Sequence, residues 1–470
     1  MDEQTAINEQ LYRVNDSKQE GKAASDIAEG QRDGFQSKWG FILACIGSAV
    51  GMGNIWRFPV MVSKYGGMTF LIPFFFFVIL IAATGVIEEM SFGRIAKAGP
   101  IGAFGTATEL RWHDRKKGEW IGMIPVLGSL ALAIGYTCVV GWVVKYTYLA
   151  FTGSLSAMGQ DLPQIASLFE TTATTFGNNF WLIVACLGSF LIMGMGVASG
   201  IEKANKIMMP ALFTMFLFLL CYVFILDKSE AGYQYIFTFN PEGLKNPFVW
   251  VYAFGQAFFT LSIAGSGTVI YGSYLSDKED VVGAAKYVAF FNLLSAMLAA
   301  CVIIPAMAIT GEKLSSGGPG LMFIHLIPVF NGMPAGRLVV IIFFICVLFA
   351  GVSSLVNLYE APVATLQEQF GFKRMPAVAT IGVLGCVSAL LIQGIVSEWM
   401  DVVSIYICPL GAVLAGLMFY WVGGKEFVLK AVNTGRETPI GAWFYPLGKY
   451  VFCVIAVAAL VIGAALGGIG

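Results

Sequence analysis

The chain has 470 residues, of which 57% are hydrophobic and only 12% are charged, and its formal net charge is −1. Soluble proteins are about 45–50% apolar and about 25% charged, so this composition, with a mean hydropathy of +0.76, indicates a polytopic membrane protein. The charge balance gives no sign of a nucleic-acid partner. The two histidines, His113 and His325, cannot supply a nucleophile–base pair, so no enzyme is expected.

Residues 1–34 are polar, with eight acids and four bases, and they lack the apolar stretch of a signal peptide. They predict a disordered cytoplasmic tail, and residues 35–470 predict a single transmembrane domain. A helical span needs about 20 apolar residues. By that measure the chain predicts eleven spans, at 38–63, 68–93, 120–150, 180–199, 207–226, 247–275, 281–310, 335–370, 376–394, 399–423 and 440–467.

Lysine and arginine set the predicted orientation. With the N-terminus inside the cell, 20 of the 28 basic residues fall on the cytoplasmic side, as the positive-inside rule requires. The sequence therefore predicts a multi-pass protein of the inner (plasma) membrane with a cytoplasmic N-terminus. An odd number of spans places the C-terminus outside.

The first span contains Gly47, Gly51 and Gly53, three glycines within seven residues. Glycine in a helix interior costs roughly 1 kcal/mol relative to alanine. In a membrane, a broken helix is tolerated only where its backbone faces protein or a water-filled site. Close packing through Gly47 and Gly51 is the alternative interpretation of this stretch.

The sixth span has a second interruption at small and hydroxyl residues, within 255–268. Spans one and six begin two consecutive five-span blocks, at 38–226 and 247–423, and the helix at 440–467 is left over. Because five is odd, the second block has inverted topology. Paired interruptions at matching places in two halves predict a binding site at the membrane midplane of a secondary transporter.

The residues that carry a family resemblance lie in and around these interruptions. They are GSAVGMGNIWRFP at 47–59, GQAFFTLS at 255–262, YGSY at 271–274 and AGVSS at 350–354. From about residue 32 to its end, the chain resembles the neurotransmitter:sodium symporter family in its bacterial, amino-acid-transporting (LeuT-like) branch. The resemblance implies an all-α fold of eleven transmembrane helices, built as a 5+5 inverted repeat with broken first and sixth helices. It also implies symport of sodium and an amino acid by alternating access.

The resemblance further implies two sodium ions, each held by uncharged oxygens. One ion site takes three carbonyls and two hydroxyls, from Gly47, Val50, Ala350, Ser353 and Ser354. The other takes a carbonyl, two amides and a threonine, from Ala49, Asn54, Asn292 and Thr260. A carboxylate oxygen of the substrate completes the second site, so the ion and the amino acid improve each other's binding.

By the same resemblance, the substrate lies between the two breaks, in contact with Ala49, Gly51, Gly53, Leu132, Tyr136, Phe259, Thr260, Ser262, Gly265, Ser354 and Leu358. Gly51 stands where amine-transporting relatives carry an aspartate, which favours an α-amino acid over an amine. Gly265 replaces a bulky side chain and leaves room, which favours a neutral amino acid with a hydrophobic or aromatic side chain.

The resemblance also implies gates. Arg57 and Asp401 form the outer pair, and Arg32 and Glu368 form the inner pair, braced by Tyr274. Chloride dependence stays open at this point, because Phe74 and Ala296 stand where chloride-dependent relatives carry a tyrosine and a serine.

Two other functions stay open from the sequence. One is proton-driven transport with Glu360, an acid within the eighth span, as the carrier, although Glu360 is also explained as a structural, hydrogen-bonded acid. The other is a membrane sensor or channel without coupled flux. The sequence does not give the oligomeric state, and beyond the amino acid and the lipid bilayer it predicts no partner.

Overall fold

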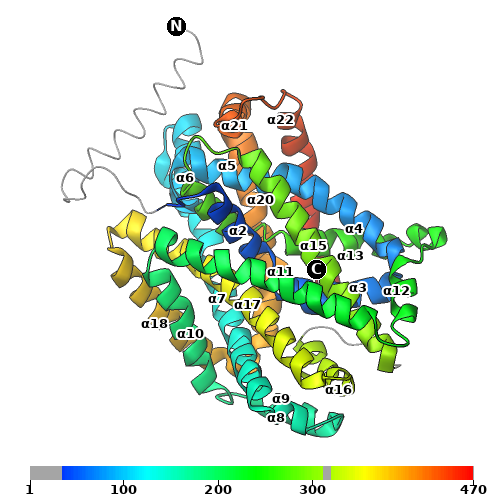
Figure 1. Ribbon diagram of the computed structural model, residues 1–470. Helices are drawn as coiled ribbons and strands as arrows, with labels where there is room; N and C mark the ends of the chain where they lie inside the picture. The colour runs from blue at the N-terminus through cyan, green and yellow to red at the C-terminus, as the bar shows by residue number, and fades with distance from the viewer. Residues whose placement is uncertain (1–33, 311–318, 469–470) are drawn as a thin grey trace.

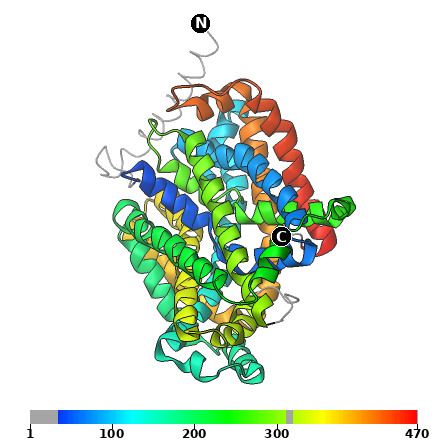
Figure 2. The ribbon, with the colours of Figure 1, turned by 45° about the vertical axis from the view of Figure 1, so that its right-hand side comes forward.

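The computed structural model describes residues 34–310 and 319–468, and every regular element in these ranges is a helix. The predicted tail and Arg32 lie outside the described residues. Figures 1 and 2 show the helices as one bundle, with α6 and α21 at one end and α8, α9 and α16 at the opposite end. The elements of the first half are α2 (Lys38–Ala49), η1 (Gly53–Arg57), α3 (Phe58–Tyr65), α4 (Met68–Ile81), η2 (Ala82–Val86), α5 (Ile87–Ala96), α6 (Pro100–Trp112), α7 (Arg115–Thr152), α8 (Ser154–Ala157), α9 (Leu162–Ala173), α10 (Asn179–Gly194), η3 (Val197–Glu202), α11 (Lys203–Phe224), α12 (Glu230–Phe237) and η4 (Pro241–Lys245).

The second half continues the bundle and leaves the second break between its first two helices. Its elements are α13 (Pro247–Thr260), α14 (Gly267–Ser273), α15 (Val281–Thr310), η5 (Leu321–His325), α16 (Leu326–Asn331), α17 (Gly336–Phe370), α18 (Arg374–Ile392), η6 (Gln393–Ile395), α19 (Val396–Val402), η7 (Val403–Ile407), α20 (Cys408–Gly416), η8 (Leu417–Val422), α21 (Gly424–Asn433), α22 (Phe444–Pro446), η9 (Leu447–Phe452) and α23 (Cys453–Leu466).

Each of the eleven predicted spans coincides with helix in the structure. Seven helical runs in the described residues are long and apolar enough to cross a membrane, or eight when the bent pair α2 and α3 counts as one span. The count is lower than eleven for three reasons. One run, 374–422, holds two predicted spans, α10 has only 16 residues, and α13 and α14 are separated by the second break.

Both predicted breaks are confirmed, and local sequence explains each. α2 begins at Ser37, whose hydroxyl accepts the Gly40 amide at 3.0 Å as an N-cap. It ends at Ala49, and the chain resumes as helix at Gly53 with a bend of 52°. At the second break, Ser262 has φ +55° and Gly265 has φ +70°. Left-handed backbone of this kind ends a right-handed helix.

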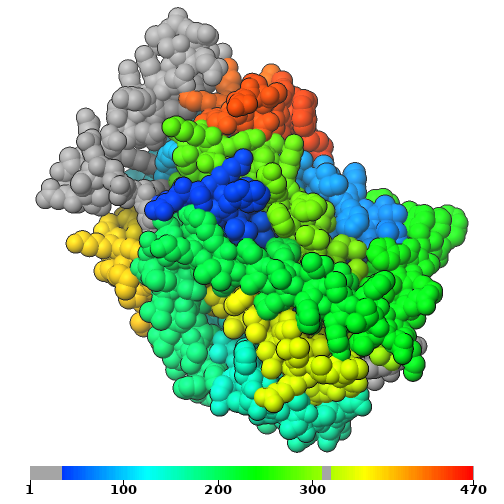
Figure 3. Space-filling model, viewed as in Figure 1, coloured from blue at the N-terminus to red at the C-terminus, as the bar shows by residue number. Residues whose placement is uncertain are grey.

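The long helices α7 and α17 run side by side through the bundle. α17 also packs against α2, α11 and α14, so one helix touches both broken spans. Most of α2 is buried, and its exposed start is visible as a blue patch at the surface (Figure 3). The breaks therefore lie inside the bundle, where their open backbone ends face protein.

Candidate functional site

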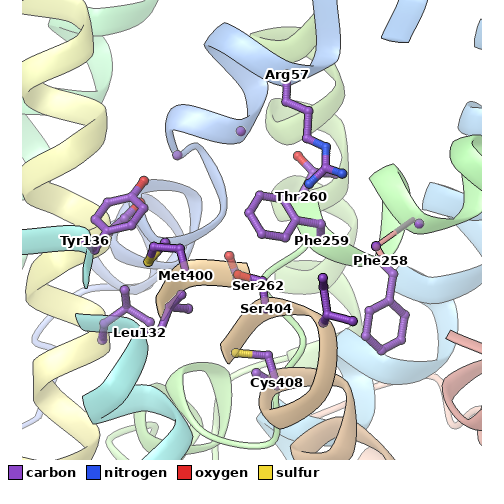
Figure 4. A pocket seen from close by; sticks show the side chains of 18 of the residues that line it. Arg57, Leu132, Tyr136, Phe258, Phe259, Thr260, Ser262, Met400, Ser404 and Cys408 are labelled. Atoms are coloured by element: carbon purple, nitrogen blue, oxygen red, sulfur yellow. The ribbon is translucent and has the colours of Figure 1, made fainter. Parts of the chain in front are cut away.

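A cavity of about 510 Å³ lies between the two breaks and is lined mainly by apolar side chains. Its walls come from the first break, α7, α13, the second break, α17 and the run from α19 to α20. Figure 4 shows Tyr136 and Phe259 on opposite sides of the cavity, with Arg57 beside Phe259. Ten of the predicted substrate residues line it: Ala49, Gly51, Gly53, Leu132, Tyr136, Phe259, Thr260, Ser262, Ser354 and Leu358.

Gly265 does not line this cavity, and the expectation that it makes room for a large substrate is wrong. Its amide donates to a carboxyl oxygen of Glu89 at 2.6 Å, and its φ of +70° favours glycine. A Cβ atom at this position would overlap the Gly411 carbonyl of α20. Glycine is needed here for a left-handed turn and close packing of backbone on backbone.

Three side-chain oxygens meet beside the first break. The Thr260 hydroxyl lies 2.6 Å from the Asn54 amide oxygen and 3.0 Å from the Asn292 amide oxygen. The Asn54 amide nitrogen donates to the Asn292 oxygen at 2.9 Å and to the Ser295 hydroxyl at 2.8 Å. All four side chains are buried. The Ala49 carbonyl, predicted for the same ion, accepts the Gly51 amide at 3.0 Å.

A second group of oxygens joins the end of α2 to the middle of α17. The Gly47 carbonyl accepts the Ser353 hydroxyl at 2.8 Å and the Ser354 hydroxyl at 3.2 Å. Ser353 also lies 3.1 Å from the Ala350 carbonyl of its own helix. Val50 is fully buried where α2 ends. These polar atoms carry no net charge, which suits a monovalent cation that exchanges water for carbonyl and hydroxyl oxygens.

The backbone of the first break faces Tyr136 and Ser354. The Tyr136 hydroxyl accepts the Met52 amide at 3.0 Å. A Cβ atom on Gly51 would lie 3.0 Å from the Tyr136 hydroxyl and 3.2 Å from the Ser354 hydroxyl. A side chain at position 51 would therefore occupy the space between the break and α7, while glycine leaves that space to a ligand.

Four of the predicted gate residues lie in the described part of the chain: Arg57, Asp401, Glu368 and Tyr274. Arg57 and Asp401 both line the cavity but form no ion pair with each other, and the Arg57 guanidinium lies 5.6 Å from the centre of the Phe259 ring. Both carboxyl oxygens of Glu368 accept the Gly99 amide at 3.0 Å. Arg32, its predicted partner, lies outside the described residues.

Tyr274, the predicted brace of the inner pair, contacts a second acid, which is buried. Its hydroxyl donates to Glu360 at 2.7 Å. Glu360 also accepts both terminal nitrogens of Arg374, at 2.5 and 2.8 Å, and is 0% exposed. A buried carboxylate with a bidentate arginine and a tyrosine is a stable ion pair, which favours the structural interpretation of Glu360 over a proton carrier.

Asn357 was not predicted as a site residue, although it lines the cavity between Ser354 and Leu358. Its amide oxygen accepts the Ser48 hydroxyl at 2.8 Å, and its amide nitrogen donates to the Gly267 carbonyl at 3.3 Å. One side chain of α17 thus connects both breaks. An asparagine in the apolar eighth span was the signal that could have identified it.

Two adjacent acids, Glu88 and Glu89, were also not predicted, and both are fully buried at the start of α5. One oxygen of Glu89 accepts the amides of Ala264 and Gly265, at 3.1 and 2.6 Å. Glu89 therefore binds the open backbone of the second break. Two acids inside an apolar span are a functional signal in their own right.

Comparisons with known proteins identify sequence and structural relatives of this chain. The sequence model of the sodium:neurotransmitter symporter family matches residues 32–161 and 163–464. An uncharacterized sodium-dependent transporter of Methanocaldococcus jannaschii is 30% identical over 457 residues, which cover 92% of this chain and 91% of that protein. One from Bacillus subtilis is 29% identical over 452 residues, which cover 91% and 96%. The crystal structure of MhsT in complex with L-phenylalanine is 29% identical, with a TM-score of 0.80 over 92% of this chain and 100% of that chain.

Proposed function

The chain belongs to the sodium:neurotransmitter symporter family, and we propose that it imports a neutral amino acid together with two sodium ions by alternating access. The observation that carries this proposal is the pair of uncharged oxygen clusters that flank one cavity at the first break. The cluster of Asn54, Thr260 and Asn292 lies on one side. The cluster of Gly47, Ser353 and Ser354 lies on the other.

The first cluster draws on three helices, η1, α13 and α15, and the second on two, α2 and α17. An ion bound at either cluster therefore holds its helices together. In the first cluster the Asn292 oxygen accepts hydrogen bonds from the Asn54 amide and the Thr260 hydroxyl. A bound ion takes the place of these two donors. In the second it lies against the Gly47 carbonyl, which now accepts two hydroxyls. A substrate carboxylate at the first cluster adds a ligand to the ion, and this shared ligand couples the two binding events.

The substrate class follows from the walls of the cavity. Gly51 leaves the position next to Tyr136 without a carboxylate, so an amine that lacks its own carboxylate has no counter-charge there. The cavity is mainly apolar, which favours a hydrophobic or aromatic side chain. This support does not depend on Gly265. The structural relative MhsT, which was crystallised in complex with L-phenylalanine, agrees with such a substrate.

The direction of transport in the cell follows from the proposed location. The excess of lysine and arginine on one side of the predicted spans favours the inner (plasma) membrane with a cytoplasmic N-terminus. Two sodium ions with a zwitterion carry two charges inward, each worth about 2.3 kcal/mol per 100 mV. The sodium gradient and the membrane potential then both drive import.

Uptake of each of twenty labelled amino acids into proteoliposomes tests the proposal. An inward sodium gradient should drive accumulation of hydrophobic or aromatic amino acids, and potassium in place of sodium should abolish it. Equal uptake with and without a sodium gradient, at a fixed pH gradient, would support the proton-driven alternative. Replacing chloride by gluconate in the same assay decides chloride dependence.

Asn54→Ala tests the first ion cluster. Removing one uncharged ligand should raise the sodium concentration for half-maximal uptake about tenfold to a hundredfold, since a lost ligand of this kind is worth about 1–3 kcal/mol. Asn240→Ala is the control, because Asn240 lies at η4 outside the cavity. Unchanged sodium dependence in Asn54→Ala would show that the assignment of this ion site is wrong.

A further inference from the structure

Glu88 is a buried carboxyl group for which the proposed transport mechanism gives no role. It is 0% exposed, and neither of its carboxyl oxygens has a hydrogen-bond partner among the described residues. No ion pair joins it to a cation in that part of the chain. An ionised carboxylate in an apolar interior without such partners costs far more than the neutral acid. Glu88 therefore holds a proton in this conformation.

The groups that face Glu88 from neighbouring helices are uncharged. Tyr420 of η8 donates its hydroxyl proton to the Thr84 carbonyl at 3.1 Å, one helical turn before Glu88. Tyr420 and Cys453, the latter at the start of α23, are two titratable groups near Glu88 on neighbouring helices of the described chain. Neither a tyrosine nor a thiol supplies a positive charge, so neither stabilises an ionised Glu88.

The cations on α5 and on the elements around it have other partners. Arg94, later on α5, donates to the carbonyls of Glu279 and Ala431, the latter on α21. On α14, which also packs on α5, Tyr271 lies near Glu360 and Arg374. Arg374 is paired with Glu360. Lys449 of η9 lies near Cys453 but stacks on the Trp421 ring, 4.2 Å from its centre. Among the described residues none of these cations forms an ion pair with Glu88.

Glu89, the next residue, differs from Glu88 in its partners. Two backbone amides of the second break donate to one of its oxygens, and such donors favour the ionised form. Its other oxygen has no partner among the described residues. Two adjacent carboxyl groups rarely carry two negative charges in a buried site. In this conformation the pair therefore holds one proton, on Glu88, and one negative charge, on Glu89.

We propose that Glu88 is a proton-binding site of the transport cycle, occupied while Glu89 holds the second break and exchanged with water when that break moves. The segment η2, which leads into the helix that carries both acids, packs on the break: a Cβ atom on Gly85 would overlap the side chain of Ile263 in the break and that of Phe452 in η9. A movement of residues 261–266 thus uncovers this part of η2 and α5 and removes the amides from Glu89. The inference rests on the proposed transport function.

Sodium-driven uptake into proteoliposomes, measured between pH 5.5 and pH 9, tests the site. The substrate is labelled L-phenylalanine or the best substrate among the twenty amino acids, and a pH-sensitive dye inside the vesicles reports proton movement. In the wild-type protein, uptake should fall at alkaline pH, by up to about tenfold per pH unit once Glu88 is mostly ionised. Adding sodium and substrate should also change the internal pH. Glu88→Gln, which mimics the protonated acid, should keep its uptake, lose most of this pH dependence and lose the proton signal.

Glu109→Gln is the matched control, because Glu109 is a partly exposed acid paired with Arg115. It should keep the wild-type pH profile. A wild-type protein with uptake but no proton signal and a flat pH profile would overturn the proposal, and so would Glu88→Gln with an unchanged profile. If Glu88→Gln does not fold, the wild-type proton signal still decides. A wild-type protein with no sodium-driven uptake at any pH would instead contradict the proposed function.

Discussion

The two helix breaks differ in the groups that bind their open ends. At the first break those groups are uncharged: the Tyr136 hydroxyl accepts the Met52 amide, and the Ser48 hydroxyl donates to Asn357. At the second break a buried carboxylate, Glu89, accepts two amides. The first break thus presents carbonyl oxygens that a cation can bind, whereas the amides of the second break are already bound by an anion of the protein.

This difference separates binding from anchoring. A fixed negative charge beside the first break would repel the carboxylate of an amino acid. A fixed negative charge at the second break is instead compensated by amides 264 and 265. The family arrangement of paired breaks at the midplane therefore contains two chemically different halves, and substitutions can test each half separately.

Replacing Glu89 should have the largest effect. Glu89→Ala leaves the amides of Ala264 and Gly265 buried without an acceptor, at about 1–3 kcal/mol for each group. We expect a loss of roughly 2–5 kcal/mol of stability and loss of transport, measured by thermal unfolding in detergent and by uptake. Glu89→Gln, which keeps one acceptor oxygen, should lose less.

Glu109→Ala serves as the control for this prediction, because a partly exposed ion pair contributes about 0–1 kcal/mol. If Glu89→Ala unfolds at the same temperature as Glu109→Ala, the carboxylate does not hold the second break. The contrast between the two breaks would then have no energetic basis.

Asn357 tests whether the two breaks are connected. Ser48→Ala, Asn357→Ala and the double variant form a cycle across a hydrogen bond of 2.8 Å. Such a bond between neutral groups is worth about 1 kcal/mol, so we expect a coupling energy near that size in stability and a shared rise in the sodium concentration for half-maximal uptake. A coupling energy near zero would mean that this hydrogen bond does not link the first break to α17. Asn357→Ser, which supplies a hydroxyl in place of the amide, should restore part of the sodium affinity lost in Asn357→Ala.

Much of this architecture follows from sequence alone. Glycines 47, 51 and 53 weaken the first helix, and small residues at 262–267 weaken the sixth, so both breaks were predictable from helix propensity and membrane depth. The family motifs then gave eleven substrate residues, of which ten line the cavity. Long-range contacts were not predictable, because no local pattern shows which side chain on another helix faces a break.

Gly265, Glu360 and Glu89 show this limit. From the sequence, the missing side chain of Gly265 predicted open space for a substrate, but the Gly411 carbonyl occupies the position of its Cβ atom. Glu360 reads as an isolated acid within an apolar run, but Arg374, which lies beyond the end of its helix, pairs with it. Glu89 gains its role only when α5 and the second break lie side by side, which depends on tertiary packing.

Ser262 offers the smallest and most local test of the second break. Its φ of +55° is costly for any residue with a Cβ atom, and its hydroxyl donates to the Ser48 carbonyl at 3.0 Å. Ser262→Ala and Ser262→Gly both remove that hydrogen bond, but only glycine relieves the left-handed backbone. We therefore expect Ser262→Gly to be more stable than Ser262→Ala by about 1 kcal/mol in thermal unfolding. Ser266, with φ −138°, is the matched control, where glycine should give no such gain over alanine. If the glycine and alanine variants differ in stability by the same amount at both positions, the strain of this break does not lie at Ser262.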